Sequence, residues 1–329
     1  MAWRGMSAQP PEPAPTGLDE FGEIDRLFRP LTRGAPGAFE LKDDAAIIPQ
    51  RAGFDLVVTK DAIVEGVHFP VGEAPELVAR KLVRVNVSDL AAKGAEPFAA
   101  FLAVAWPHGF SQRDREYFVM GLSADLEAFG IDLLGGDTVK TPGPFTCTLT
   151  AMGWVPSGRM VRRAGARPGD KLLVSGTIGD ATLGLAAVMG EIEDPDGRLA
   201  YRYRLPEPRV DLRETLRRHA TAAADVSDGL VADARHIAEA SGVGLLIDLD
   251  RLPLSGAAAT WLEGQGDVGA GLLRLGTGGD DYEVVCTMAS GVKKPPGFTV
   301  IGEVREGSEV EVRAAGRTID AGAGGWRHG

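Results

Sequence analysis

The chain has 329 residues, of which 44% are hydrophobic and 25% charged, and these values indicate a globular protein of about two domains. Its 46 acidic and 35 basic residues give a formal net charge of -11, which would repel a bare polyanion, so we expect no nucleic acid partner. No segment approaches the roughly 18 consecutive apolar residues of a membrane-spanning helix, so we expect no membrane partner either.

The first 17 residues include four prolines and no apolar run of signal-peptide length, and they predict a disordered tail. Beyond this tail, the spacing of hydrophobic residues predicts helices and strands up to residue 156. The predicted helices cover residues 19–31, 75–92 and 114–129, and the predicted strands cover residues 45–48, 56–59, 98–106 and 145–155.

A segment rich in Arg, Gly and Pro, residues 156–169, predicts the connection between two domains, 18–156 and 157–329. In the second domain the pattern predicts strands over 171–175, 244–248, 282–288, 298–304 and 309–312, helices over 180–189 and 229–240, and a polar loop with a helical turn over 191–208. This mixture of elements predicts an α/β fold.

Both cysteines, Cys147 and Cys286, lie within apolar runs and have no partner at metal-binding spacing. The five histidines form no i, i+4 pair of a zinc motif. We therefore expect buried, reduced thiols in a cytoplasmic protein, and a zinc enzyme is disfavoured.

The placement of the aspartates is the most informative feature of the sequence. They recur where a predicted element meets a loop or a glycine, at Asp44, Asp61, Asp89, Asp137, Asp225, Asp228, Asp280 and Asp281. Any single one could be a helix cap or a turn residue. Clustered carboxylates near apolar elements, however, need compensation, and Mg2+ bound by carboxylates commonly also holds substrate phosphates.

Phosphoryl transfer fits this pattern, because positioning and charge neutralisation supply most of its catalysis and no conspicuous nucleophile is needed. The chain contains no Gly-Lys-Ser/Thr of a P-loop, no protein-kinase catalytic loop and no Asp-Phe-Gly. The turn 176–179 could present backbone amides to a phosphate, although a plain strand-to-helix turn is the favoured interpretation.

Seven segments carry a family resemblance: LKDDAAII, VVTKDAIVEGVHF, VNVSDLAAKGAEP, LLGGDTVK, VRRAGARPGD, ADVSDGL and GTGGDDYEV. In order and spacing they resemble thiamine-monophosphate kinases, over residues 21–326. That family belongs to the aminoimidazole-ribonucleotide-synthetase superfamily of ATP-binding dimers. The resemblance implies a homodimer joined through N-terminal mixed sheets with flanking helices, and a C-terminal α/β domain that completes the nucleotide site.

The resemblance also implies an activity, the phosphorylation of thiamine monophosphate (TMP) by ATP, and a role for each matching residue. The implied Mg2+ ligands are Asp44, Thr59, Lys60, Asp61, Asp89, Asp137 and Asp225, with Asp228 near a further ion. The implied ATP contacts are Gly136, Asp137, Arg163 and Ser227, and the implied TMP contacts are His68, Asp280 and Trp326. Asp44, Asp89 and Asp137 are the expected catalytic residues.

Three lysines depart from the family pattern. Lys60 stands where a hydroxyl residue is common, so that its backbone carbonyl could serve as the ligand, Lys42 replaces a glycine, and Lys93 replaces a common methionine. Structural roles stay open for three residues: Trp326 as an anchor rather than a ring that stacks on the cationic substrate, Arg163 in its Arg-rich segment, and His68.

Alternative functions also stay open. Another ATP-dependent synthetase of the superfamily is one, although selenophosphate synthetases resemble this fold with a reactive residue near the N-terminus, and this chain has no cysteine before Cys147. Hydrogenase-maturation relatives end in cysteine, whereas this chain ends in Gly329. A metal-dependent phosphohydrolase and a non-catalytic nucleotide-binding protein are two others.

Overall fold

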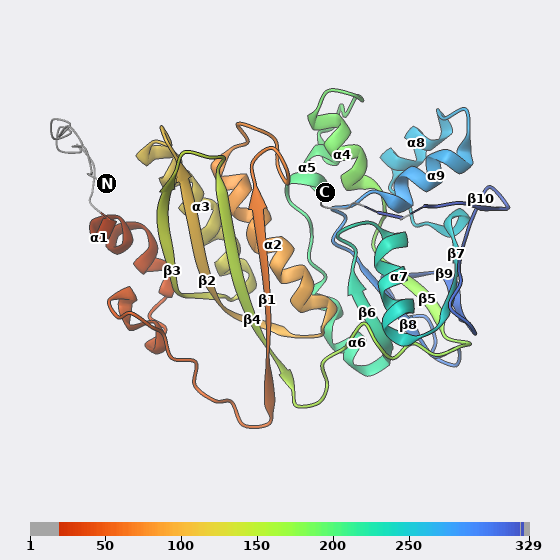
Figure 1. Cartoon of the computed structure of the whole chain (residues 1–329), viewed down its shortest axis with the longest axis horizontal. Coiled ribbons are helices and arrows are strands. Elements are labelled where there is room, and N and C mark those ends of the chain that lie inside the picture. The colour runs from red at the N-terminus through yellow and green to blue at the C-terminus, as the bar shows by residue number, and fades with distance from the viewer. Residues whose placement is uncertain (1–19, 323, 326–329) are drawn as a thin grey trace, which may run out of the picture.

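The computed structural model describes residues 20–322, 324 and 325, and its two sheets with flanking helices confirm the expected α/β class (Figure 1). The expected disordered tail and Trp326 lie outside the described residues. No helix in the described part of the chain has the length and hydrophobicity needed to cross a bilayer.

The N-terminal half is built on a four-stranded sheet of order β1-β4-β2-β3. Its elements are α1 (Glu20–Glu23), irregular helical turns at Ile24–Phe28, Arg29–Thr32 and Pro36–Leu41, β1 (Phe54–Val64), α2 (Pro75–Ala92), β2 (Glu96–Pro107), α3 (Gln112–Phe129), β3 (Asp132–Thr141) and β4 (Thr146–Pro156). Strand β4 runs antiparallel to β1 and β2, and β3 runs parallel to β2. Helices α2 and α3 cover one face of the sheet (Figure 1).

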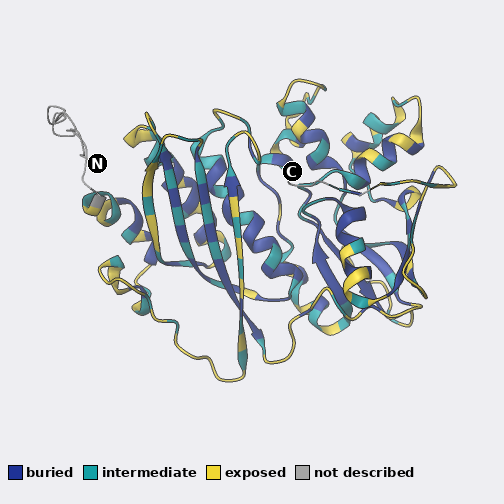
Figure 2. Ribbon diagram, viewed as in Figure 1, coloured by how far each residue is buried: buried dark blue, intermediate teal, exposed yellow. Residues whose placement is uncertain are grey.

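The alternation of side chains along β1 decides which residues face α2 and which face away. Thr59, Asp61 and Ile63 are buried or half-buried, whereas Val58, Lys60 and Ala62, which alternate with them, are exposed. Thr59 and Asp61 both bond to residues of α2, so this set faces the helices. The sheet therefore has a second, open face, which Figure 2 shows as a mixture of half-buried and exposed residues.

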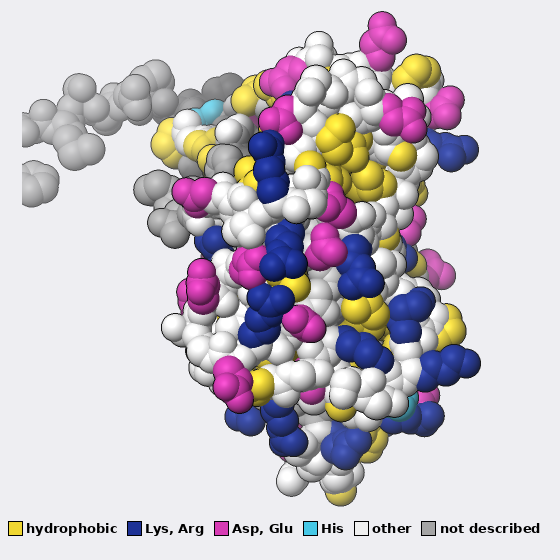
Figure 3. Space-filling model, turned by 90° about the vertical axis from the view of Figure 1, so that its right-hand side faces the viewer, with side chains coloured by type: hydrophobic (Ala, Val, Ile, Leu, Met, Phe, Trp, Pro, Cys, Tyr) yellow, Lys and Arg dark blue, Asp and Glu magenta, His cyan; other side chains and the backbone are white. Residues whose placement is uncertain are grey.

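The C-terminal half contains a seven-stranded sheet of order β11-β10-β7-β9-β5-β8-β6. Its strands are β5 (Lys171–Ser175), β6 (Ala220–Asp225), β7 (Gly244–Asp248), β8 (Val284–Met288), β9 (Phe298–Arg305), β10 (Val310–Ala314) and β11 (Arg317–Ile319). Its helices are α4 (Asp180–Val188), α5 (Arg198–Arg204), α6 (Arg213–His219), α7 (Leu230–Ser241), α8 (Gly256–Glu263) and α9 (Val268–Thr277). At the far end of this half, Lys and Arg interleave with Asp and Glu (Figure 3).

Helix α2 joins the two halves, because its side chains reach backbone groups of the C-terminal half. The Lys93 ammonium group donates to the carbonyl of Ala223 at 2.8 Å, and Arg84 donates to the carbonyl of Pro206 at 2.9 Å. In return, Arg217 of α6 donates to the carbonyl of Gly94, just beyond α2. The C-terminal end of β6 is thereby held against α2.

Most predicted elements are confirmed, with one clear error. The predicted strand 45–48 is a loop that makes a single sheet-like contact, from the Ile47 amide to the Gly37 carbonyl at 2.9 Å. The apolar residues that suggested a strand, Ala46 and Ile48, instead pack near Leu134. Strand 56–59 is longer than predicted and continues through Asp61 to Val64.

Candidate active site

Four predicted ligands from three elements meet where the N-terminal half contacts the C-terminal half. They form the junction cluster, which consists of Thr59, Asp61, Asp89 and Asp225. The Thr59 hydroxyl donates to the Asp89 carboxylate, and the Asp61 amide donates to Asn86 Oδ1 at 3.2 Å. Asp225 ends β6, and only 4% of it is exposed.

Burial and mutual repulsion disfavour the ionised form of the carboxyl groups in the junction cluster. Burial, and after it the charge of Asp89, raises the pKa of Asp61 to about 6. Burial also raises the pKa of Asp225 well above its ordinary value, reinforced by Asp89 and then Asp233. Burial lowers the pKa of the nearby Lys93 ammonium group. A divalent cation would relieve this repulsion.

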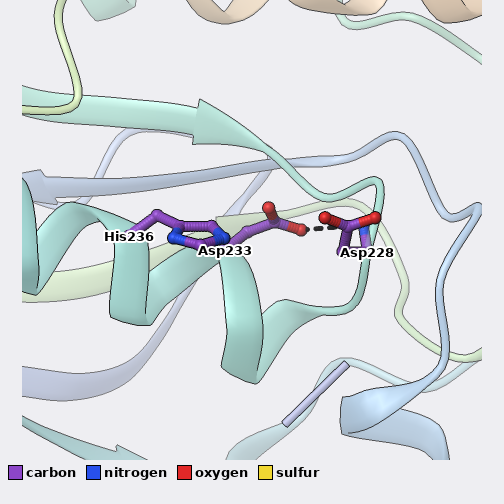
Figure 4. A group of neighbouring side chains, drawn as sticks. All are labelled: Asp228, Asp233 and His236. Carbon is purple, nitrogen blue, oxygen red and sulfur yellow. Dashed lines mark hydrogen bonds between the residues drawn. The ribbon is translucent and has the colours of Figure 1, made fainter. Parts of the chain in front are cut away.

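A second acidic group lies just beyond Asp225, at the start of α7 (Figure 4). One oxygen of the buried Asp233 accepts hydrogen bonds from the amides of Ser227, Asp228 and Gly229, at 3.0, 3.1 and 3.3 Å. Its other oxygen is buried without a hydrogen-bond partner among the described residues. Ligand atoms of Asp228, Asp233 and His236 lie within 4.8 Å of one another, close enough to share one cation.

Asp233 and His236 were not predicted as site residues from the sequence, although a signal for them was present. Both lie on the helix that follows the Asp-Gly turn, at i, i+3 spacing, so they share one face of it. Burial, and then the charge of Asp228, raises the pKa of Asp233 to about 6. Arg163, an expected ATP contact, is exposed and lies within electrostatic reach of Asp233, near Ser227.

The two expected acceptor contacts, His68 and Asp280, also lie at the junction. The Asp280 amide donates to the Ser227 carbonyl at 2.8 Å, so its loop is tied to the loop that follows Asp225. Lys81 of α2 donates to the Asp280 carboxylate at 3.1 Å and to the His68 carbonyl at 3.0 Å. His68 and Asp280 are thus held next to each other although they come from different halves.

Asp281, the neighbour of Asp280, has a different role. Its carboxyl group is fully buried and accepts hydrogen bonds from the amides of Gly179 and Ala181, at 2.7 and 3.1 Å. Burial raises its pKa to about 8. The amide of Gly179, in the turn considered for phosphate binding, is therefore already bonded within the protein, which supports the plain strand-to-helix turn.

The remaining predicted residues lie on the other side of the sheet. Asp44, Gly136 and Asp137, the edge group, line a cavity of about 330 Å3 beside β3. A side chain at Gly136 would place its Cβ 1.8 Å from the Leu102 carbonyl oxygen, so this position accepts only glycine. Asp137 pairs in register with Ala103 of β2, which places its side chain on the open face.

The structure therefore brings the predicted residues into two places, and not into one. Strands β1 and β3 are the opposite edges of the sheet, with β4 and β2 between them. Three strand spacings separate the edges by about 14 Å, whereas Mg2+ requires its ligands at about 2.1 Å. One ion cannot take ligands from Asp61 and Asp137 of the same chain.

Lys60 is the predicted ligand with the least favourable placement. Its side chain is exposed on the open face, opposite to Thr59 and Asp61. The Lys60 ammonium group therefore points away from the junction cluster and does not take the place of a ligand there. If Lys60 binds a metal ion, it does so through its backbone carbonyl. Trp326, the third expected acceptor contact, lies outside the described residues.

Comparisons with known proteins agree with this architecture. Residues 42–155 match the family model described as "AIR synthase related protein, N-terminal domain", and residues 167–315 match the corresponding C-terminal domain. Fold and site thus define a two-domain protein of the AIR synthase related class, with the junction cluster placed between the halves. Among curated relatives, the thiamine-monophosphate kinase of Caulobacter vibrioides is 52% identical and covers 96% of this chain and 93% of its own.

Solved structures extend the likeness to three dimensions. The thiamine-monophosphate kinase of Stenotrophomonas maltophilia K279a is 38% identical and superimposes with a TM-score of 0.79, over 92% of this chain and 98% of that one. A structure described as AaThiL complexed with AMPPCP and TMP is 33% identical with a TM-score of 0.75, over 92% and 94% of the two chains. The chain belongs to the thiamine-monophosphate kinase family.

Proposed function

We propose that this protein transfers the γ-phosphate of ATP to TMP and releases thiamine diphosphate and ADP. The junction cluster carries the proposal, because three carboxylates that repel one another, two of them with raised pKa values, meet between the two halves, and among the described residues Lys93 is the cation that acts on Asp225. The family adds the substrates: a relative is named for this activity, and another is described in complex with an ATP analogue and TMP.

The residues fit Mg2+ as the cofactor. They are oxygen donors, which Mg2+ prefers, and their repulsion is the kind that a divalent cation relieves. We assign Asp61, Asp89 and Asp225 with Thr59 as ligands in one place, Asp44 and Asp137 in the other, and Asp228 to a further ion. When bound, Mg2+ would neutralise charge on the triphosphate and on the transferred group.

In the proposed reaction, an oxygen of the TMP phosphate attacks the γ-phosphorus of ATP in line. A new P–O bond forms while the bond to the β,γ-bridging oxygen breaks, and ADP leaves with that electron pair. The attacking phosphate is largely dianionic at neutral pH, because its second pKa is about 6, so no general base is needed. The chain's own part is to orient both phosphates: Arg163, Ser227 and Gly136 toward ATP, and His68 and Asp280 toward TMP.

A comparison of acceptors tests this proposal. With ATP and Mg2+, we expect rapid ADP release in the presence of TMP, and release at least about 100-fold slower with thiamine or without acceptor, because only TMP presents the attacking phosphate oxygen. A coupled ADP assay measures the three rates. Equal release under all three conditions would indicate a phosphohydrolase and would reject TMP as the acceptor.

The raised pKa of Asp61 predicts how Mg2+ stabilises the protein at different pH values. This pKa is about 6 in the folded protein against an ordinary value of 3.8, so ionising Asp61 costs folding stability as the pH rises through that window. Mg2+ competes with the proton and reverses this cost. The Mg2+-induced rise in Tm should be at least about twice as large near pH 7.5 as near pH 5.

Thermal unfolding with and without Mg2+ at both pH values measures this effect. An Asp61→Asn variant is the matched control, because it has no proton to lose at this position and should show a weaker dependence on pH. Equal shifts of Tm at the two pH values in the unmodified protein would contradict the assignment of Asp61 as a ligand.

We also propose that the protein is a homodimer joined through the open faces of the N-terminal sheets. Val58 and Val139 are 56% and 50% exposed there, which is unusual for large apolar side chains of a sheet. A two-fold axis along the strands, between two such faces, would place β3 of one subunit over β1 of its partner. The edge group of one subunit would then face β1 of its partner, the strand that carries Thr59 and Asp61, and we propose that both groups serve one nucleotide.

Two further assignments complete the proposal. The halves act as domains 18–156 and 157–329, since β4 ends at Pro156 and β5 begins at Lys171. Cys147 and Cys286 are buried, free thiols, which supports a reducing, cytoplasmic setting.

A further inference from the structure

Lys81 is a buried cation at the junction that the sequence argument did not single out. It lies in the middle of α2, and only 4% of its side chain is exposed. Its ammonium group contacts three segments that are distant in sequence: the His68 carbonyl at 3.0 Å, the Asp280 carboxylate at 3.1 Å and the ring of Tyr203, whose centroid is 3.9 Å away.

The surroundings of Lys81 leave it one carboxylate partner. A buried ammonium group is costly unless it is paired and hydrogen-bonded, and among the described residues Lys81 forms an ion pair with Asp280. The other acidic group near Tyr203, Glu73, is engaged by Arg204 at 2.7 Å. Lys81 is therefore the cation that holds the Asp280 carboxylate, which also bonds to the Tyr282 side chain.

Asp280 is held from its backbone as well. Its φ is +68°, a left-handed conformation that is unfavourable for a residue other than glycine, and its amide donates to the Ser227 carbonyl at 2.8 Å. A Cβ at the preceding Gly279 would lie 2.4 Å from that same carbonyl oxygen, so the two loops are in close contact. Backbone and carboxylate are thus anchored to different halves of the protein.

The His68 carbonyl is held in the same way. It accepts hydrogen bonds from Lys81 and from the Tyr203 hydroxyl, the latter at 3.3 Å. Tyr203 belongs to α5 of the C-terminal half, and the Lys81 ammonium group lies over its ring in a cation–π contact. One cation therefore fixes the spacing between the segment of His68 and the loop of Asp280.

We propose that Lys81 is a positioning residue for the acceptor substrate, which sets the distance between His68 and Asp280 across the junction of the two halves. This inference rests on the proposed function, because it assumes that these two residues contact TMP. Lys81 acts through them and contacts no reacting atom. Its loss should therefore impair TMP binding and leave ATP binding intact.

The test is a kinetic comparison of Lys81→Met with the unmodified enzyme. We expect the KM for TMP to rise by about 10- to 100-fold, because the Asp280 carboxylate loses its cationic partner, while the KM for ATP changes less than about twofold. Lys81→Arg keeps the charge and should raise the KM for TMP less than Lys81→Met does. If the methionine variant fails to fold, the arginine variant carries the test, with an expected rise of about threefold or more.

A charge-matched control lies one residue earlier on the same helix. Arg80 pairs with Asp125 inside the N-terminal half, and Asp125 keeps its bond to Arg84 when Arg80 is replaced. Arg80→Met should leave both KM values unchanged. This control separates a loss of charge on α2 from the loss of the contact with Asp280.

A double-mutant cycle with Asp280→Asn tests whether Lys81 acts through Asp280. In the Asp280→Asn background, Lys81→Met should raise the KM for TMP by less than about threefold more. Additive effects, equal changes of both KM values, or an unchanged KM for TMP in a folded variant would overturn the proposal. If the unmodified enzyme does not phosphorylate TMP, the proposed function fails and this inference falls with it.

Discussion

Replacing Asp89 by asparagine should lower kcat by about 1,000-fold or more under saturating ATP, TMP and Mg2+, because the substitution removes a charge from the centre of the junction cluster. Asparagine has nearly the same shape and can still accept the hydrogen bond from Thr59. The loss of kcat would therefore be caused by the missing charge and not by altered packing. The coupled ADP assay measures kcat, and circular dichroism verifies the fold.

The same substitution should not lower the thermal stability of the metal-free protein. Asp89 raises the pKa values of both Asp61 and Asp225, so without Mg2+ its charge opposes folding. Asp89→Asn should keep or raise the Tm of the metal-free protein while it abolishes turnover. Asp196→Asn is the control, because Asp196 is 77% exposed and its nearest ion-pair contact, with Arg198, is 3.9 Å long. Turnover of Asp89→Asn within tenfold of the unmodified enzyme would exclude Asp89 from catalysis.

Part of this site could be predicted from the sequence, because residues at regular spacing along a helix lie on the same face of it. Lys81, Asp89 and Lys93 follow one another at multiples of four residues, which places them on one face of α2. Contacts of all three with the other half or with β1 agree with that spacing. The Asp-Gly pair after β6 likewise predicts a turn, and Ser227 and Asp228 lie in that loop.

Other features have no local signal. Strand β6 contains the run Ala222 to Ala224, which lacks the β-branched residues typical of strands, and its pairing with β8 decides its structure. Strand β3 includes Gly135 and Gly136, and a register shift opposite Phe101 accommodates them. The predicted strand 45–48 was wrong because its apolar residues pack against Leu134 without a partner strand.

The division of the predicted ligands into two groups also depends on topology. Asp61 and Asp137 are both strand residues. Their spacing along the chain does not reveal that β1 and β3 form opposite edges of one sheet. The order β1-β4-β2-β3 arises from pairings between residues as distant as Phe54 and Pro156. The arrangement of the strands in space therefore decides that the two groups lie apart within one chain.

Asp137→Asn should abolish turnover like Asp89→Asn, because the proposed site takes carboxylates from both groups. The two variants differ in location: Asp89 lies in the junction cluster, and Asp137 lies in the edge group. If each site combines the junction cluster of one subunit with the edge group of its partner, a mixed dimer of the two variants contains one site with both defects and one site with neither.

Co-expression of the two variants with different affinity tags, followed by purification on both tags, isolates this mixed dimer. We predict that it recovers about half of the kcat of the unmodified dimer, since one of two sites is intact. A mixed dimer of Asp89→Asn with Asp225→Asn is the matched control and should stay inactive, because each of its sites keeps a defective junction cluster. An inactive Asp89→Asn and Asp137→Asn mixed dimer, or a purely monomeric enzyme that is active, would contradict the account.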